Sequence, residues 1–311
     1  MADIGIVIVT YNSRAEIVAC LDAAARSGAE VVVVDNASSD DTVDEVRRHG
    51  VRLVSNPTNR GFAAAVNQGF AALTTPYVLL LNPDAKLLGG LEALCEACRL
   101  PGAAGAGGKL VDAQGHPQVG FMVRQLPTPL AVALEVLLLN RIWPNNPVNR
   151  RYRGLQLNYN MRIPVEQPAG AFLMVRRAVW QELGGFDESF FPLWFEDVDF
   201  CRRAVDAGFR IQYIPDVAAS HIGGHSVTQV LASTRAWYWC ASLIKYASKH
   251  FREPGYRGVC AAVVLSSIPR MVAGMILARS LAPISAYSKI VWFAGLRLVS
   301  ARRPGVIKIR S

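Results

Sequence analysis

The chain has 311 residues, of which 51% are apolar, so it is not an intrinsically disordered protein and can form one large or two medium-sized domains. Its formal net charge is +9. The charge is uneven, because the segment from Lys245 to the end contains twelve Lys or Arg residues and one acid, Glu253. That segment therefore carries +11 and residues 1–244 carry −2, so only the C-terminal part is basic.

Short β-branched runs alternate with helical patterns over the first 81 residues. The patterns predict strands at 4–9, 31–35, 51–55 and 77–81, and helices at 13–27, 38–48 and 61–73. Continuous apolar strands that alternate with helices are typical of a parallel sheet covered on both faces. The start of the chain, MADIGIVIVTYN, has no charged leader before a long apolar core, so no signal peptide is predicted.

The order of elements is less regular after residue 81. Residues 101–125 are glycine-rich and predict loops with short strands, 126–143 predict an apolar helix, and 144–164 predict a mobile polar excursion. Further strands are predicted at 171–177 and 211–215, and further helices at 178–183, from about Asp197, and at 235–251.

The segment 258–300 has apolar stretches that Pro269, Arg270, Arg279 and Pro283 interrupt. We expect none of them to reach the roughly 20 residues that a membrane-spanning helix needs. Apolar faces interleaved with Arg and Lys suit a helix in a membrane interface. A helical appendage that packs on the domain, or on a second subunit of a homodimer, is the alternative. The segment has no aromatic pattern of a nucleic-acid module, so no nucleic-acid partner is expected.

Six cysteines are scattered along the chain, and only Cys95 and Cys98 form a CxxC pair. No second pair completes a zinc site, and the three-residue spacing fits one face of a helix, so these thiols are expected to pack in a core. A reduced, cytosolic setting is the simplest interpretation.

Polar residues follow the first three predicted strands. Thr10 and Asn12 stand where a dinucleotide-binding protein would need GxGxxG, so that class is disfavoured. Asp35 and Asn36 end the second strand, where a carboxylate can accept the imide N–H of uracil or thymine, or simply cap a helix. Arg60 precedes the helix after the third strand, where a guanidinium can pair with a diphosphate.

Asp84 follows the fourth strand in the sequence YVLLLNPDAK. Asn-Pro-Asp is good turn chemistry, but a carboxylate at the carboxyl edge of a parallel sheet can also bind Mg²⁺ or Mn²⁺. His221, which opens HIGGHS, can give a nitrogen ligand to the same metal, whereas His225 is expected to have no such role.

Three acids lie in the aromatic sequence GGFDESFFPLWFEDVDFCRRA, namely Glu196, Asp197 and Asp199. Acids among aromatic residues are unusual on a solvated face. Glu196 and Asp197 are therefore the catalytic candidates, as a general base needs a tuned carboxylate. The alternative is that they only cap the following helix.

Together these motifs resemble family 2 glycosyltransferases of the GT-A fold, and most of all the bacterial rhamnosyltransferase group. The resemblance runs from about Ile4 to Ser226 through IVIVTYNS, VVVVDNASSDDT, NRGFAAAVNQG, LLLNPD, GAFLMVRR, GGFDESFFPLWFEDVDFCRRA and HIGGHS. It implies an α/β fold with a mostly parallel sheet flanked by helices and a C-terminal helical extension. Residues 1–228, with an insertion at about 126–164, would form the catalytic domain, and 229–311 a basic helical region.

The resemblance also implies roles for individual residues. Thr10, Asn12, Asp35, Asn36 and Arg60 would line the nucleotide. For the metal site, Asp84 stands where the metal-binding DxD motif of the family ends, although Asn82 replaces the first acid of that motif. Asp197 would be the base, next to Glu196, and His221 a second ligand of the metal or diphosphate.

The implied reaction is an inverting transfer from dTDP-L-rhamnose, or secondly from a UDP-sugar, to a saccharide on a polyprenyl diphosphate in cell-wall or O-antigen (lipopolysaccharide) synthesis. The enzyme would be cytoplasmic and peripheral on the inner face of the cell membrane, at anionic lipid. A processive synthase would need a QxxRW signature, which the stretch QVLASTRAW does not match. A non-enzymatic nucleotide-sugar-binding protein is the rival from another class.

Overall fold

The computed structural model describes residues 3–223 and 231–300 and divides the chain into two compact units. Within those residues, the sheet unit comprises Met1–Leu126, Arg153–Glu188 and Glu196–Ser226, and the helical unit comprises Pro127–Tyr152, Ser189–Phe195 and Val227–Ser311. The predicted insertion at 126–164 is thus shared between the units. The functions predicted for the two parts of the chain stay predictions.

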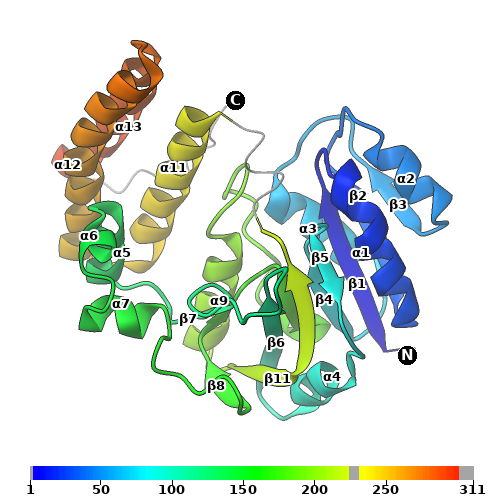
Figure 1. The fold of residues 1–311 in the computed structure, drawn as a ribbon. Helices are drawn as coiled ribbons and strands as arrows, with labels where there is room; N and C mark the ends of the chain where they lie inside the picture. Colours follow the sequence, from blue (N-terminus) through cyan, green and yellow to red (C-terminus); the bar gives the residue numbers. More distant parts are fainter. Residues whose placement is uncertain (1–2, 224–230, 301–311) are drawn as a thin grey trace. The chain divides into compact units, whose positions relative to one another are not determined.

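The first half of the sheet unit confirms the predicted alternation of strands and helices (Figure 1). Its strands are parallel and run in the order β3-β2-β1-β4. Their apolar runs are buried because helices cover the sheet. The elements are β1 (Ile4–Thr10), α1 (Arg14–Arg26), β2 (Glu30–Asp35), α2 (Thr42–Arg48), β3 (Arg52–Ser55), α3 (Phe62–Ala72) and β4 (Tyr77–Leu81).

The second half extends the same sheet in the order β4-β10-β6-β11-β5. β10 is antiparallel to both of its neighbours, β6 and β11 are parallel, and β5 and β8 pair antiparallel with β11. The predicted α/β class is confirmed. The elements are β5 (Ala85–Leu87), α4 (Glu92–Arg99), β6 (Ala103–Val111), β8 (Ile163–Val165), β10 (Phe172–Arg176), α8 (Arg177–Glu182), α9 (Glu196–Asp206) and β11 (Arg210–His221), with β7 (Val123–Arg124) and β9 (Gln167–Pro168) forming a separate pair.

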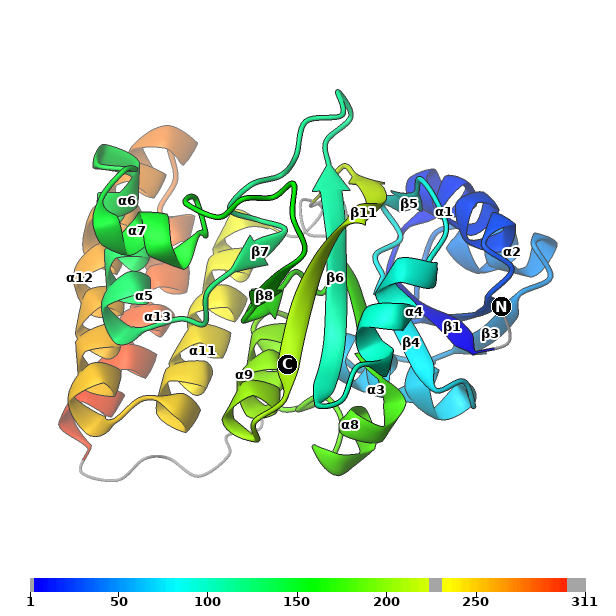
Figure 2. The ribbon, with the colours of Figure 1, turned by 90° about the horizontal axis from the view of Figure 1, so that it is seen from below.

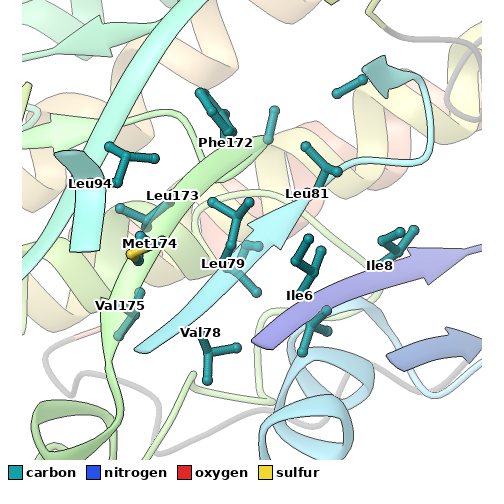
Figure 3. Packing of buried hydrophobic residues seen from close by; sticks show 14 of the residues in the cluster. Ile6, Ile8, Val78, Leu79, Leu81, Leu94, Phe172, Leu173, Met174 and Val175 are labelled. Atoms are coloured by element: carbon teal, nitrogen blue, oxygen red, sulfur yellow. The ribbon is translucent and has the colours of Figure 1, made fainter. Parts of the chain in front are cut away.

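The core of the sheet unit contains buried side chains from the neighbouring strands β1, β4 and β10 and from α4 (Figure 3). Ile6, Leu79 and Leu173 come from three neighbouring strands, and Leu94 comes from α4. α4 also buries Cys95 and Cys98, which are free thiols, so the packing interpretation of the CxxC pair is confirmed. This rigid centre fixes the strand ends on which the candidate site is built.

The glycine-rich stretch at 101–125 contains a long central strand, so the prediction of loops with short strands is wrong. β6 pairs with β10 on one side and with β11 on the other, and Figure 2 shows it as a long strand beside β11. A Cβ at Gly105 would collide with the Met174 carbonyl oxygen, and one at Gly108 would collide with the Phe172 ring. The glycines are there because neighbouring groups approach this strand closely, which no strand propensity in the sequence indicates.

The strand predicted at 211–215 is also longer than expected. β11 continues to His221, through an irregularity in its pairing with β6 between Ile214 and Ala218. Its last residues then pair with β5, with His221 opposite Ala85. The extension brings the histidine to the strand that follows Asp84.

The helical unit consists of α5 (Pro129–Val136), α6 (Leu139–Ile142), α7 (Pro147–Tyr152), α11 (Ala232–His250), α12 (Glu253–Ala278) and α13 (Ala282–Val299) (Figure 1). The single helix predicted at 126–143 is wrong, because the chain turns at Leu138, whose φ is 62°. The excursion at 144–164 holds α7 and β8, so it is not devoid of regular structure.

α12 also differs from the prediction of interrupted apolar stretches, since it continues through Pro269. A proline removes one N–H donor, and packing against α5 and α13 holds the turns on either side of it. Within the described residues, Glu253–Leu277 is a helix that is long and apolar enough to cross a membrane. A helix in the core of a globular protein can have the same length and composition.

Candidate functional site

Asp84 and His221 come together at the end of β4, as the sequence predicted. Asp84 lies in the turn from β4 to β5, and the pairing of β5 with β11 places His221 beside it. Asp84 Oδ1 and His221 Nε2 are 3.5 Å apart, and both side chains are buried. The two predicted metal ligands therefore share one corner of the sheet.

The His221 ring is held in a fixed orientation. Its Nδ1 is 3.1 Å from Gln118 Oε1, and Phe121 stacks on the ring at 5.1 Å. Gln118 Nε2 also donates to the His221 carbonyl oxygen. With Nδ1–H donating to Gln118, Nε2 keeps its lone pair and faces Asp84. Burial lowers the pKa of His221, although the charge of Asp84 opposes this, and so favours the neutral imidazole.

The chemistry of this corner fits a hard divalent cation. Asp84 Oδ1 is buried with no hydrogen-bond partner, and such an oxygen is costly to bury unless something pairs with it. Among the described residues, no group of three or more His, Cys, Asp or Glu side chains gathers around one point. Mg²⁺ commonly binds through one or two protein ligands together with substrate phosphates and water. Asp84 and His221 suit that mode.

Asp197 is tied to the same end of the sheet. It lies in the first turn of α9, where Oδ2 accepts the Gly170 N–H at 2.9 Å and Oδ1 accepts the Val198 N–H at 2.8 Å. The next residue, Ala171, accepts the N–H of Asn82 at 3.1 Å. Asn82 is two residues before Asp84, so a short hydrogen-bonded path joins the predicted base to the metal corner.

Burial raises the pKa of Asp197, while the N–H groups of Gly170 and Val198 and the charge of Arg124 act in the opposite direction. The pKa of Glu196 is raised well above its ordinary value, first by burial and then by the charge of Asp197. Glu196 Oε2 has no hydrogen-bond partner. A carboxylate whose pKa is raised toward neutrality is a better general base than an ordinary surface acid.

Asp199, the third acid of this sequence, has a structural role. Its carboxylate is fully buried and accepts from Arg203 Nε at 2.8 Å. Arg203 also donates to the carbonyl oxygens of Leu183 and Gly185. Because Asp199 and Arg203 are four residues apart in a predicted helix, their spacing in the sequence could have indicated this ion pair.

The predicted nucleotide residues gather at the ends of β1 and β2. Thr10 and Asp35 are neighbours in the strand pairing, and Thr10 Oγ1 donates to Asp35 Oδ1 at 2.8 Å. The N–H and hydroxyl of Ser38 also donate to Asp35. Asn12, whose φ is 50°, accepts the Ser39 N–H through its Oδ1. Asp35 is 1% exposed and organises this loop. The sequence did not single out Ser38, which donates to Asp35, or Ser39, which donates to Asn12.

Asn36 links this group to α3. Its Nδ2 donates to the Gly61 carbonyl oxygen at 3.0 Å, and its Oδ1 accepts the backbone N–H of Arg60 at 3.4 Å. Arg60 is exposed just before the helix N-terminus. A guanidinium and a helix N-terminus together favour an anion.

The structure thus forms two clusters at the carboxyl ends of neighbouring strands. Thr10, Asn12, Asp35, Asn36 and Arg60 lie at β1, β2 and α3, and Asp84, His221, Glu196 and Asp197 lie around the end of β4. β1 and β4 are adjacent and parallel, which places both clusters at one edge of the sheet. His225 lies outside the described residues.

The chain matches two family models. The model described as glycosyl transferase family 2 matches residues 5–182, and that of glycosyl transferase family group 2 matches residues 153–300. The first match covers the two clusters except Glu196, Asp197 and His221, which the second match covers.

Similar proteins are known by sequence and by structure. The chain is 31% identical over 265 residues to an N-acetylglucosaminyl-diphospho-decaprenol L-rhamnosyltransferase of Mycobacterium tuberculosis, covering 79% of this chain and 84% of that protein. It is 26% identical over 223 residues to the low-salt glycan biosynthesis hexosyltransferase Agl10 of Haloferax volcanii, covering 70% and 67%. A mannosyltransferase from Pyrobaculum calidifontis, solved with GDP-Man and Mn²⁺, has the same fold, with a TM-score of 0.54 at 17% identity over 96% of this chain and 87% of that one.

Proposed function

The chain belongs to glycosyl transferase family 2 and is a glycosyltransferase, and we propose that it transfers L-rhamnose from dTDP-L-rhamnose to a polyprenyl-diphosphate-linked saccharide. The name of the mycobacterial relative, 31% identical, supports both this donor class and this acceptor class. A UDP-sugar is the second candidate donor. Family membership decides against the non-enzymatic alternative.

One observation carries the proposal. Asp84 and His221 meet at the end of β4, and Asp197 is joined to that strand end through Gly170 and Ala171. A transferase needs groups that bind the leaving diphosphate close to a base that activates the acceptor. The arrangement supports both proposed roles, because the residues lie at one edge of the sheet.

The proposed roles follow from the geometry. The cluster around Thr10, Asp35 and Asn36 would bind the nucleoside, and Arg60 at the N-terminus of α3 would bind diphosphate oxygens. Asp84 and His221 would hold Mg²⁺ or Mn²⁺. That cation would supply positive charge to the departing diphosphate.

Asp197 would remove the proton from the acceptor hydroxyl. The acceptor oxygen then forms its bond to the anomeric carbon while the bond from that carbon to the diphosphate breaks, and the electron pair leaves with the nucleoside diphosphate. A single displacement of this kind inverts the anomeric configuration. Burial raises the pKa of the base itself, and the charge of Asp197 in turn adds to the raised pKa of its neighbour Glu196.

Substitution of Asp197 by Asn tests the proposed function. A general base typically contributes about 100- to 10,000-fold, so kcat should fall within that range while the affinity for the donor stays the same. The assay follows sugar transfer from dTDP-L-rhamnose, and in parallel from UDP-sugars, to a lipid-linked saccharide, with calorimetry of donor binding. Unchanged turnover in Asp197→Asn would remove this residue as the base. Transfer from UDP-sugars alone would replace the proposed donor.

The proposed setting is cytoplasmic, at the inner face of the cell membrane, where a polyprenyl-linked acceptor is anchored. The basic C-terminal segment, with +11 against −2 for residues 1–244, supports a peripheral attachment to anionic lipid.

A further inference from the structure

The outer side of α12 is an unbroken apolar surface in a basic segment. Leu265, Ile268, Val272 and Ile276 are spaced three or four residues apart, so they lie along one face of the helix. All four side chains are exposed, and that of Ile276 is 70% exposed. We call these four residues the outer stripe.

The opposite face of α12 already has partners inside the helical unit. Ser266 and Ser267 are buried on this face, and their hydroxyls donate to the Val263 carbonyl oxygen of the same helix. Arg270 donates to the Val136 carbonyl oxygen at the C-terminus of α5, at 2.7 Å. A helix with hydrogen-bonded polar groups on one face and only apolar side chains on the other suits an interface, and does not suit a membrane span.

The charges around the outer stripe indicate what covers it. Arg279 is exposed at the C-terminal end of α12, and the exposed Arg257 near the other end pairs with Glu253 at 2.7 Å. From Lys245 onward Glu253 is the one acid of the sequence. A second copy of the chain would bring the same basic residues against the first, and like charges would oppose that contact. Anionic lipid head groups complement the basic residues, while acyl chains take up the apolar stripe.

We propose that the outer stripe of α12 is a membrane-contact surface, on which the helical unit lies flat against anionic lipid. The proposal deepens the proposed function, because it assigns the attachment to four side chains. It does not depend on the sugar that is transferred.

Vesicle binding of the full chain tests this surface. The probes are vesicles of phosphatidylcholine with and without phosphatidylglycerol, and the variant carries Ile268→Glu and Ile276→Glu. Its partition onto the anionic vesicles should fall at least about tenfold, because binding scales with buried apolar area. Leu100→Glu, at an exposed apolar position of the sheet unit, is the matched control and should bind as wild type does.

Two results would overturn the proposal. One is wild-type binding by the double variant. The other is a dimeric wild type whose double variant is monomeric by light scattering but still binds vesicles. That result would show that a second copy of the chain covers the outer stripe. Asp197→Asn should bind vesicles normally, so failure of the surface and failure of the proposed catalysis are distinguishable.

A second, independent observation concerns the segment Ser189–Phe195, which we call the aromatic loop. It belongs to the helical unit, although the chain on both sides of it, ending at Glu188 and resuming at Glu196, belongs to the sheet unit. The loop therefore leads directly into the residues that carry the proposed base.

One face of α11 holds the aromatic loop. Ser242 Oγ donates to the Leu193 carbonyl oxygen at 3.1 Å, and Lys245 Nζ donates to the Ser189 carbonyl oxygen. The buried Phe195 ring packs against Tyr246 with centroids 5.5 Å apart. The spacing of the three α11 residues places them on the same side of the helix.

The end of the aromatic loop has an unfavourable backbone conformation. Trp194 and Phe195 have φ values of 78° and 71°, which bulky residues rarely adopt. Such a conformation persists only where surrounding contacts fix it, and it occurs often at functional sites. Here it comes immediately before Glu196 and Asp197.

The structure assigns Ser242 and Lys245 of α11 as positioning residues, which act on Asp197 through the aromatic loop. This inference rests on the proposed role of Asp197.

The test is the double variant Ser242→Ala and Lys245→Met, with Ser248→Ala of the same helix as control. We expect kcat to fall about tenfold, while the KM for the donor and the affinity for free nucleoside diphosphate stay the same, because only the base is displaced. Lys245→Arg, which keeps a donor, should restore most of the rate. Unchanged kcat, or an equal loss of kcat, donor affinity and melting temperature, would overturn the assignment. Loss of activity in this variant while Asp197→Asn stays active would instead refute the role of Asp197.

Discussion

In the sheet unit, polar side chains are buried at strand ends, whereas in the helical unit large apolar side chains lie on the outside. Asp84 and Glu196 are buried and each leaves an oxygen without a partner, while Ile276 and Trp292 are largely exposed. Both features are unfavourable in an isolated globular protein. Each becomes favourable if something else binds there, a charged donor in the sheet unit and a lipid surface in the helical unit.

The comparison also separates two kinds of charged side chain that are withdrawn from solvent. The buried Asp199 accepts from Arg203, and the half-buried Arg270 donates to Ser266 and to the Val136 carbonyl oxygen, so each has a partner in its own unit. Glu196 is a buried acid with an unpaired oxygen. We therefore expect that replacing a charged side chain that has partners destabilises the fold, and that replacing the unpaired Glu196 stabilises it.

The largest effect should come from Asp199→Asn. Breaking a buried ion pair leaves Arg203 without its charge partner and typically costs about 3–5 kcal/mol. Asp206→Asn is the matched control, because Arg202–Asp206 is an exposed pair in the same helix and such pairs contribute about 0–1 kcal/mol. Urea unfolding measures both. Equal, small losses would show that the Asp199 pair does not hold α9 in place.

A smaller effect is expected at the nucleotide end of the sheet unit. Arg60→Ala removes a charged partner of the diphosphate, and a hydrogen bond to a charged group contributes about 1.5–3 kcal/mol. The Kd for nucleoside diphosphate should therefore rise by about tenfold or more, as measured by calorimetry. Arg47→Ala, an exposed arginine of α2, should leave the Kd as it is. Equal affinities in the two variants would place the diphosphate elsewhere.

The smallest effect, and one of opposite sign, is expected for Glu196→Gln. Because burial raises the pKa of Glu196, the folded state holds this proton more tightly than the unfolded chain does. The stability of the wild type therefore falls as the pH rises from the unfolded pKa through the folded pKa. The Gln variant does not ionise, so it should melt at a higher temperature than wild type at about pH 8 and at nearly the same temperature at about pH 4, near the ordinary carboxyl pKa.

Thermal unfolding at the two pH values measures this difference, with the exposed Glu182→Gln as control. A Gln variant that is less stable than wild type at about pH 8 would show that the carboxylate is held by interactions that favour its charged form.

Much of the sheet unit could be predicted from the sequence, because β1 to β4 and the helices between them follow simple periodicities. The strand β6 could not be predicted, because its glycines have no strand propensity. Gly105 and Gly108 are explained only by the close approach of Met174 and Phe172 from the neighbouring strand. The continuity of α12 could not be predicted either, because Pro269 normally ends a helix and here tertiary packing maintains it.

The residues of the candidate site could be selected from the sequence where a motif contained them, and their roles stay predictions. Asp84, His221 and Asp197 were identified as motif residues, and the strand pairing brings them to one sheet edge. Gln118 and Phe121, which orient His221, were missed because they lie in a loop with no periodic signal. Their role appears only once β11 has placed His221 at the end of the sheet.

A crystal structure with a nucleoside diphosphate and Mn²⁺ tests the central claim most directly, since anomalous scattering identifies the metal. The account predicts manganese beside Asp84 and His221, the diphosphate near Arg60, and the Asp197 carboxylate facing the same bound ligand. Manganese or nucleotide bound away from Asp84 and His221, or Asp197 facing a different cavity, would contradict it.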